Sequence, residues 1–251
     1  MLLSTVLRMG KKKRWAAMVL AMKIFEVKER MELPLMARKL RDFREEEPYE
    51  SGGKKLELRT EILDLKMEGE GLAGVFSRDF VLSRYYRRGV VEVPVTEEVP
   101  FWIRPFRGRT FLLVLAPSRA RGVKKLLTNY VANKLSEILF LRTGAIVEGR
   151  ITHETLRKLH ESNPQATKLI WFDDLDIPNV GKVALAGSAL ADSRLYREYL
   201  EHGKIWYAVF EFRKYHMVVG ITRNCVITTF SRVELGNFLE CVLTEILPLI
   251  S

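Results

Sequence analysis

Arginines alternate with aromatic side chains in two short stretches near the middle of the sequence, residues 84–88 and 101–109. The arginine guanidinium binds phosphate through two parallel hydrogen bonds, and an aromatic face stacks on an unpaired base. We therefore predict that these stretches bind nucleic acid, DNA or RNA, with Tyr85, Tyr86 and Trp102 stacking or wedging. The alternative is that the aromatic residues belong to the core and the arginines lie over them. The arginines predicted to contact phosphates are Arg84, Arg87, Arg88, Arg104, Arg107 and Arg109.

A third group of basic residues falls at the start of a predicted helix. Apolar residues recur at helical spacing from Val123 to Leu139, which predicts a helix from about Ser118 to Leu141. The amino end of a helix carries partial positive charge, so cations in the first turns are unfavourable. A bound phosphate would relieve this, and acidic residues from elsewhere in the fold are the alternative. The basic residues are Arg119, Arg121, Lys124 and Lys125.

The positive charge is concentrated in the same middle part of the chain. The 251 residues carry a formal net charge of +10. Residues 71–150 hold 14 basic and 6 acidic residues, a net of +8, whereas residues 1–70 have a net of +3 and residues 151–251 a net of −1. A localised basic surface attracts polyanions and accelerates their capture. Charge that serves only solubility is the alternative, and its confinement to one segment argues against that.

A run of carboxylates supports a rival, enzymatic function. Asp173, Asp174 and Asp176 form a short acidic group, and Glu211 and Lys214 lie on or near a predicted strand. Oxygen ligands beside a lysine suit metal-assisted cleavage of a phosphodiester, which predicts a metal-dependent nuclease. A polar turn is the alternative, and the spacing matches no nuclease motif. We therefore expect no catalytic residue, no metal and no cofactor; a protein-interaction or assembly subunit is the third candidate.

Composition restricts the class of protein. The two cysteines, Cys225 and Cys241, are too few for a secreted disulfide framework, so we expect buried thiols, with one bridge between them as the alternative, and a cytoplasmic location. No apolar run approaches the roughly 20 residues that span a bilayer, so no membrane partner is expected. Gln165 is the only glutamine beside 72 charged residues, a composition typical of thermophiles. Residues 1–21 are predicted to be a basic and apolar extension, a misassigned start codon being the alternative.

The order of predicted elements indicates an α+β fold, with antiparallel sheets packed against helices. Residues 22–150 are predicted to form a basic lobe and residues 151–251 a near-neutral lobe. In the first lobe the pattern predicts an extended segment at 23–44, a loop at 45–53, and strands at 56–66, 90–95 and 110–116. Pro94 is expected at a strand edge or strand end.

The C-terminal lobe has a more regular pattern. It predicts a helix capped by Thr152, short strands at 168–172 and 183–186, and a helix at 194–202 capped by Asp192 or Ser193 and closed by a left-handed Gly203. Three strands then follow at 205–212, 217–222 and 225–230, and a capping box from Ser231 to Glu234 opens the last helix.

This order of strands, helix, three-stranded meander and long helix resembles one repeat of the TATA-binding-protein-like fold, with the best match from Lys204 to Leu249. The resemblance concerns topology, and the aromatic wedge residues of that family have no assignable counterparts in this sequence. It implies relatives that bind DNA and others that bind proteins. We accordingly expect the near-neutral lobe to pack on the first lobe, or to bind a protein partner or a second copy of the chain.

Overall fold

The computed structural model describes the backbone of residues 18–51, 54–116 and 124–251. The chain divides into two compact units. The middle unit is Phe25–Val147, and the terminal unit combines Met1–Ile24 with Glu148–Ser251. The strand β1 (Ala21–Val27) contributes residues to both units, because the chain passes from the terminal unit into the middle unit at Ile24. The α+β class with antiparallel strands is confirmed.

The middle unit is an antiparallel sheet with two helices. Its strands follow the order β2-β3-β4-β5-β6, each paired with the next in sequence. The elements are α1 (Leu33–Arg41), β2 (Arg44–Ser51), β3 (Lys54–Glu68), β4 (Gly71–Tyr86), β5 (Gly89–Phe106), β6 (Arg109–Leu115), α2 (Lys124–Phe140) and β7 (Ile146–Glu148).

One face of this sheet is covered by the two helices. Residues paired across antiparallel strands point to the same face, and the pairs Leu72–Ile103 and Phe76–Val99 both belong to the core. Helix α1 contributes Met36, Ala37 and Leu40 to this core, and α2 contributes Val131, Ala132, Leu135 and Leu139. The apolar stripe predicted for the second helix therefore packs on the sheet, although the described helix begins at Lys124 and not at Ser118.

Three local predictions for the middle unit are wrong. Residues 33–41 form a helix and not an extended segment, because Leu33, Met36, Ala37 and Leu40 lie on one face and Pro34 occupies its first turn. Residues 45–50, predicted as part of a loop, belong to β2, the outermost strand of the sheet, where charged residues and Pro48 are tolerated. The strand β4 was not predicted, because its glycines and charged residues obscure the alternation of apolar side chains.

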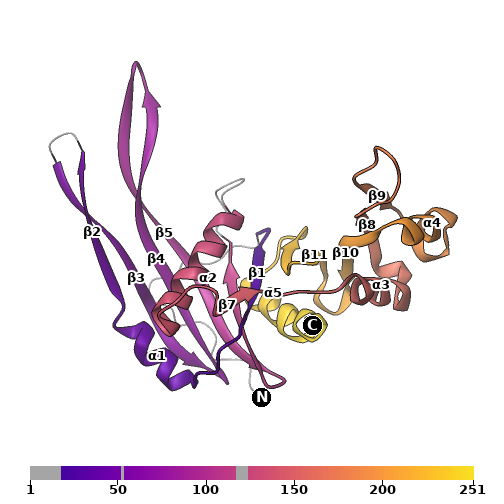
Figure 1. The fold of residues 1–251 in the computed structure, drawn as a ribbon, viewed down its shortest axis with the longest axis horizontal. Coiled ribbons are helices and arrows are strands. Elements are labelled where there is room, and N and C mark those ends of the chain that lie inside the picture. Colours follow the sequence, from indigo (N-terminus) through magenta and orange to yellow (C-terminus); the bar gives the residue numbers. More distant parts are fainter. Residues whose placement is uncertain (1–17, 52–53, 117–123) are drawn as a thin grey trace. The chain divides into compact units, whose positions relative to one another are not determined.

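The hairpin of β4 and β5 extends beyond the covered part of the sheet (Figure 1). We call residues Phe80–Val95 the arm. Pairing of β3 with β4 ends at Arg78, and pairing of β5 with β6 begins at Phe101, so the arm is a two-stranded ribbon. None of its side chains is buried. Pro94 lies on the free edge of β5 within this ribbon, as the prediction of an edge position required.

The terminal unit is a second antiparallel arrangement of strands and helices. Its strands follow the order β1-β12-β11-β10-β8-β9, with β1 contributing Ala21–Lys23. The elements are α3 (His153–Ser162), β8 (Thr167–Asp173), β9 (Val183–Ala186), α4 (Arg194–His202), β10 (Lys204–Phe212), β11 (Met217–Thr222), β12 (Val226–Thr229) and α5 (Leu235–Cys241). A π-helical turn, Val242–Ile246, continues α5.

The helix caps in the terminal unit agree with the sequence only in part. Thr152 and Ser193 cap α3 and α4, as predicted: their hydroxyl oxygens accept hydrogen bonds at 3.1 Å from the backbone N–H groups of Thr155 and Tyr196. The predicted capping box is wrong: Glu234 is the N-cap of α5, because Ser231 Oγ accepts from the Val218 N–H. Gly203 is extended and not left-handed; an added Cβ would lie 2.5 Å from the Leu175 side chain.

Candidate nucleic-acid interface

The first arginine–aromatic stretch occupies the end of the arm. Arg87 and Arg88 form the two-residue turn that connects β4 to β5, and Arg87 adopts a left-handed φ of 54°. Tyr85 is 75 % exposed and Tyr86 is 63 % exposed. The Arg87 guanidinium lies 5.5 Å from the centroid of the Tyr86 ring. All five side chains from Arg84 to Arg88 are therefore presented to solvent at one tip.

The charge at this tip is uncompensated among the described residues. No ion pair involves Arg84, Arg87 or Arg88 within the described ranges. The cross-strand pairs Tyr85–Val90 and Arg84–Val91 place the tyrosine and the arginine on opposite faces of the ribbon. The tip therefore presents positive charge on its turn, Arg84 and Tyr86 on one face, and Tyr85 on the other face.

Residues of the second stretch lie in a different environment. Trp102 is 7 % exposed and pairs across the sheet with Ala73 and Leu113, so it is a core residue and is not available to stack on a base. The alternative prediction for this stretch was that its aromatic residues belong to the core, and it is correct for Trp102. The prediction that it contacts nucleic acid is corrected accordingly.

Two arginines of the second stretch form ion pairs. Arg104 Nη2 lies 3.1 Å from Glu68 Oε1, and Arg109 donates to both oxygens of Glu26, at 2.9 Å from Nε and 2.8 Å from Nη2. Hydrogen bonding from Arg109, helped by Lys28, lowers the pKa of Glu26 to about 2 against the opposing effect of burial. Arg104 and Arg109 are already neutralised by these carboxylates. The two arginines are therefore weak candidates for phosphate contact.

Arg107 is the exposed arginine of this stretch. It lies on the tight turn between β5 and β6 with a φ of 49°, and its guanidinium is 5.0 Å from the centroid of the Phe106 ring. The strand β5, with 18 residues, separates this turn from the arm tip. At about 3.3 Å per residue the two turns are roughly 60 Å apart along the ribbon, so the two stretches do not form one binding surface.

The third basic group cannot be placed. Arg119 and Arg121 lie outside the described residues, as do the side chains of Lys124 and Lys125 at the start of α2.

Sequence reasoning also missed part of the arm surface: Val90, Val91 and Val93 are all exposed beside the arginines. The pattern of residues 90–95 predicts a strand. It does not indicate that the valine side chains of that strand are exposed.

The carboxylates of the predicted nuclease site do not come together. Asp173 pairs with Lys204 in the register of β8 and β10, and Glu211 lies seven residues further along β10. That separation is about 23 Å at strand spacing. Glu211 forms an ion pair with Lys168 at 2.8 Å, and Asp173 pairs with Arg223. In the described ranges no three His, Cys, Asp or Glu residues are grouped as metal ligands.

A cleft of about 380 Å³ lies beside Asp173 in the terminal unit. Trp206 and Arg223 line it. Asp176 is outside the lining, and its Oδ1 accepts a 2.8 Å hydrogen bond from His202 Nδ1. The carboxylate oxygen Oδ1 of Asp173 and the indole Nε1 of Trp206 are buried there without hydrogen-bond partners. Both atoms are closed to solvent, so the cleft does not offer them to a ligand in this conformation.

Cys225 and Cys241 are buried free thiols, as predicted, and burial raises the pKa of Cys241 to about 12. Across the described ranges, no helix is both long enough and apolar enough to cross a bilayer.

Neither the known protein families nor the curated proteins contain a match to this chain.

Proposed function

We propose that this protein binds nucleic acid through the tip of the arm, without catalysis. The observation that carries the proposal is the exposure of Arg84, Tyr85, Tyr86, Arg87 and Arg88 together at the end of a two-stranded ribbon. Both tyrosines are exposed to solvent, and the three arginines form no ion pair in the described ranges, so all five side chains are accessible to a ligand. Their common location therefore favours a ligand that takes both cations and aromatic rings.

The width of the ribbon favours duplex DNA among the nucleic acids. The major groove of B-form DNA admits a two-stranded β-ribbon, and arginine reads guanine there while also contacting phosphates. The major groove of A-form RNA is too deep and narrow for such an element. The tip arginines would neutralise phosphates, and Tyr85 would contact bases or sugars from the opposite face of the ribbon. Arg107, about 60 Å away along β5, is not part of this interface.

The test is fluorescence-anisotropy titration of duplex DNA, single-stranded DNA and RNA across a series of salt concentrations. For duplex DNA, each lost phosphate contact reduces the slope of log K against log salt by about 0.9. We expect Arg88→Ala to reduce the slope by that amount. Arg194→Ala removes an exposed arginine from α4 in the terminal unit and should leave the slope unchanged.

Tyr85→Ala tests the aromatic contribution in the same assay. Loss of base stacking costs about 1–3 kcal/mol per base for single strands, so an effect confined to single-stranded ligands would point to stacking and away from groove binding. Binding of all three ligands that is weak at physiological salt and indifferent to Arg88→Ala would reject the proposal. The basic tip would then serve only as a solvated surface.

A further inference from the structure

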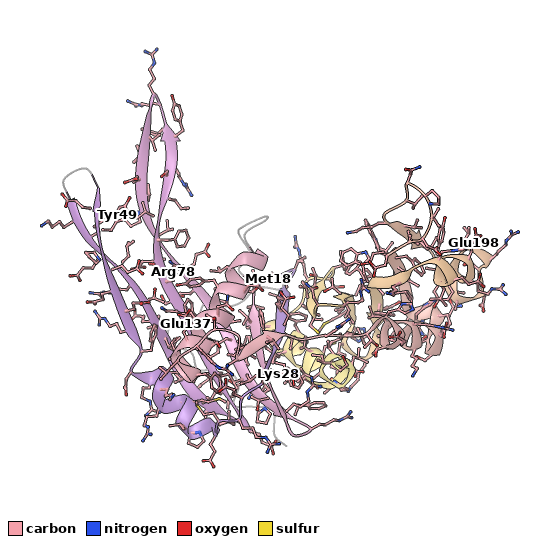
Figure 2. The ribbon with its side chains drawn as sticks, in the orientation of Figure 1. Met18, Lys28, Tyr49, Arg78, Glu137 and Glu198 are labelled. Atoms are coloured by element: carbon pink, nitrogen blue, oxygen red, sulfur yellow. The ribbon has the colours of Figure 1, made fainter. Side chains whose placement is uncertain are left out.

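The sheet of the terminal unit has one face that is covered by helices. The cross-strand pair Phe172–Ile205 is fully buried on this face, and the ring of Tyr196 on α4 lies 6.1 Å from the Phe172 ring. Figure 2 labels Glu198, which lies on the same helix. On β12, buried and half-buried residues alternate along the strand. The half-buried positions belong to the opposite face, because successive side chains of a strand point to opposite sides.

Three aromatic rings lie together on that opposite face. We call it the open face and define it by the cross-strand pair Trp171–Tyr207 and the residues in register with that pair. Trp206 lies in the bulge that precedes Tyr207, and its ring centroid is 6.1 Å from the Trp171 ring and 5.6 Å from the Tyr207 ring. All three side chains are half-buried, so part of each ring is accessible to solvent.

Small residues beside the rings leave their outer sides uncovered. A Cβ added to Gly220 of β11 would lie 2.1 Å from the Tyr207 hydroxyl oxygen and 2.7 Å from the ring carbons Cε2 and Cζ. Glycine therefore allows the Tyr207 ring to lie over the backbone of the next strand, with its other side directed away from the sheet. On the β9 side, the exposed Ala184 is the partner of Trp171. Such rings can stack on a planar ligand.

Uncompensated cations lie beside these rings. The exposed Lys182 places its Nζ 4.7 Å from the centroid of the Trp206 ring, and the exposed Arg150 lines the 380 Å³ cleft that Trp206 also lines. Neither cation forms an ion pair within the described ranges. The carboxylates of the open face, Asp173 and Glu211, are each paired with a basic side chain. The surface therefore matches a ligand that is both planar and anionic.

We propose that the open face binds single-stranded DNA. Unpaired bases stack on the outer sides of Trp171 and Tyr207, and phosphates contact Lys182 and Arg150. A neutral sugar or an apolar peptide would leave both cations unused, whereas a nucleic-acid strand supplies rings and negative charge together. DNA is favoured over RNA because the proposed function places duplex DNA at the arm tip, and this part of the proposal rests on that function.

Tryptophan fluorescence of the full chain, titrated with oligothymidylate, reports on this face. Trp102 is buried in the middle unit, and the arm contains no tryptophan. Trp15 lies outside the described residues, so the titration is carried out in a Trp15→Phe background. We expect saturable quenching, because a base stacked beside Trp171 and Trp206 alters their emission. Fluorescence that does not respond to oligothymidylate even at low salt overturns the proposal.

Substitution of Tyr207 tests the stacking. Tyr207→Leu should weaken binding at least about fivefold, whereas Tyr207→Phe, which keeps the ring, should bind like the wild type. The unfolding midpoint, followed by circular dichroism, verifies that both variants are folded. Equal affinities of Tyr207→Leu and Tyr207→Phe would contradict stacking on this ring.

Lys182→Ala tests the phosphate contact without any change in the sheet, because Lys182 is exposed. It should reduce the slope of log K against log salt by about 0.7, the value for one phosphate of a single strand. Lys158→Ala is the matched control, since Lys158 is an exposed lysine on α3, a helix that packs on the covered face. Equal slopes in the two variants would contradict the contact.

The arm and the open face can be tested separately. Arg88→Ala should weaken the binding of duplex DNA and leave the quenching by oligothymidylate unchanged, because the tryptophans of the open face lie in the terminal unit. Quenching that persists while duplex binding proves indifferent to Arg88→Ala would reject the proposed function alone. Oligouridylate is titrated in parallel, and tighter binding of oligouridylate than of oligothymidylate would overturn DNA as the ligand of the open face.

Discussion

The two arginine–aromatic stretches of the middle unit have similar compositions and opposite environments. Residues 84–88 lie at the end of a two-stranded ribbon, where both tyrosines are more than half exposed. In residues 101–109, Phe101 to Ile103 lie where β5 is paired on both sides, Trp102 is buried, and Arg104 and Arg109 pair with carboxylates. Composition therefore indicates that arginines and aromatics occur together, whereas their position along one hairpin decides whether they form a surface or a core.

The largest expected effect concerns the aromatic residues. Trp102→Ala should lower the free energy of unfolding by about 3–5 kcal/mol, because it leaves a large cavity in a packed sheet face. Tyr86→Ala at the arm tip should change it by less than about 0.5 kcal/mol. Urea denaturation followed by circular dichroism, at low protein concentration, gives both values. Comparable destabilisation by the two substitutions would contradict the division of the hairpin into core and arm.

The ion pair of Arg109 with Glu26 predicts a pH dependence of stability. The pKa of Glu26 in the folded protein is about 2, below the ordinary value of 4.5. Its contribution is therefore complete above pH 4.5 and is lost as the pH falls toward 2, to a total of about 3 kcal/mol at most. We expect Glu26→Gln to lose less stability than the wild type between pH 7 and pH 3.

Urea denaturation at those two pH values provides the comparison. Glu47→Gln is the control, because Glu47 is an exposed carboxylate on the outermost strand β2 and forms no ion pair in the described part of the chain. If Glu26→Gln and the wild type lost the same free energy on acidification, the Arg109 pair would not hold this carboxylate in its charged form.

The smallest expected effect distinguishes an arginine that stabilises the fold, Arg104, from one proposed to bind DNA, Arg88. Arg104→Ala should destabilise the protein by about 1–3 kcal/mol, since it removes the hydrogen bonds that Arg104 donates to the carboxylate and the backbone carbonyl of Glu68. It should leave the salt dependence of DNA binding unchanged. Arg88→Ala should do the reverse. A reduced salt slope in Arg104→Ala would place the second stretch in the interface after all.

Several elements of the terminal unit could be predicted because their determinants are local. Thr152 and Ser193 cap helices through hydroxyls three residues from the N–H groups that they satisfy, and β9 occupies the predicted residues 183–186. The capping box at Ser231 failed because its hydroxyl accepts a hydrogen bond from Val218, a residue of another strand. Local patterns hold only where no tertiary partner competes for the same group.

The candidate site could be predicted only in part. Arg84 to Arg88 were identified by residue type, and the structure places them together at one tip. Trp102 was misassigned because nothing in its neighbours distinguishes an aromatic residue paired with Ala73 and Leu113 inside a sheet from one at a free tip. The strand β4, which supplies half of the arm, lacked a clear alternation and was missed.

The sequence by itself determined the class of fold, the excess of positive charge in residues 71–150 and the presence of arginine beside aromatic residues, because these depend on composition and short-range periodicity. Tertiary structure alone decided which arginines are paired, which aromatic residues are buried and how far apart the two stretches lie. Each of those depends on contacts between residues distant in the chain, such as Arg109 with Glu26 and Trp102 with Ala73. The hairpin register, fixed by the core pairs at its base, also decides which side chains share each face of the arm.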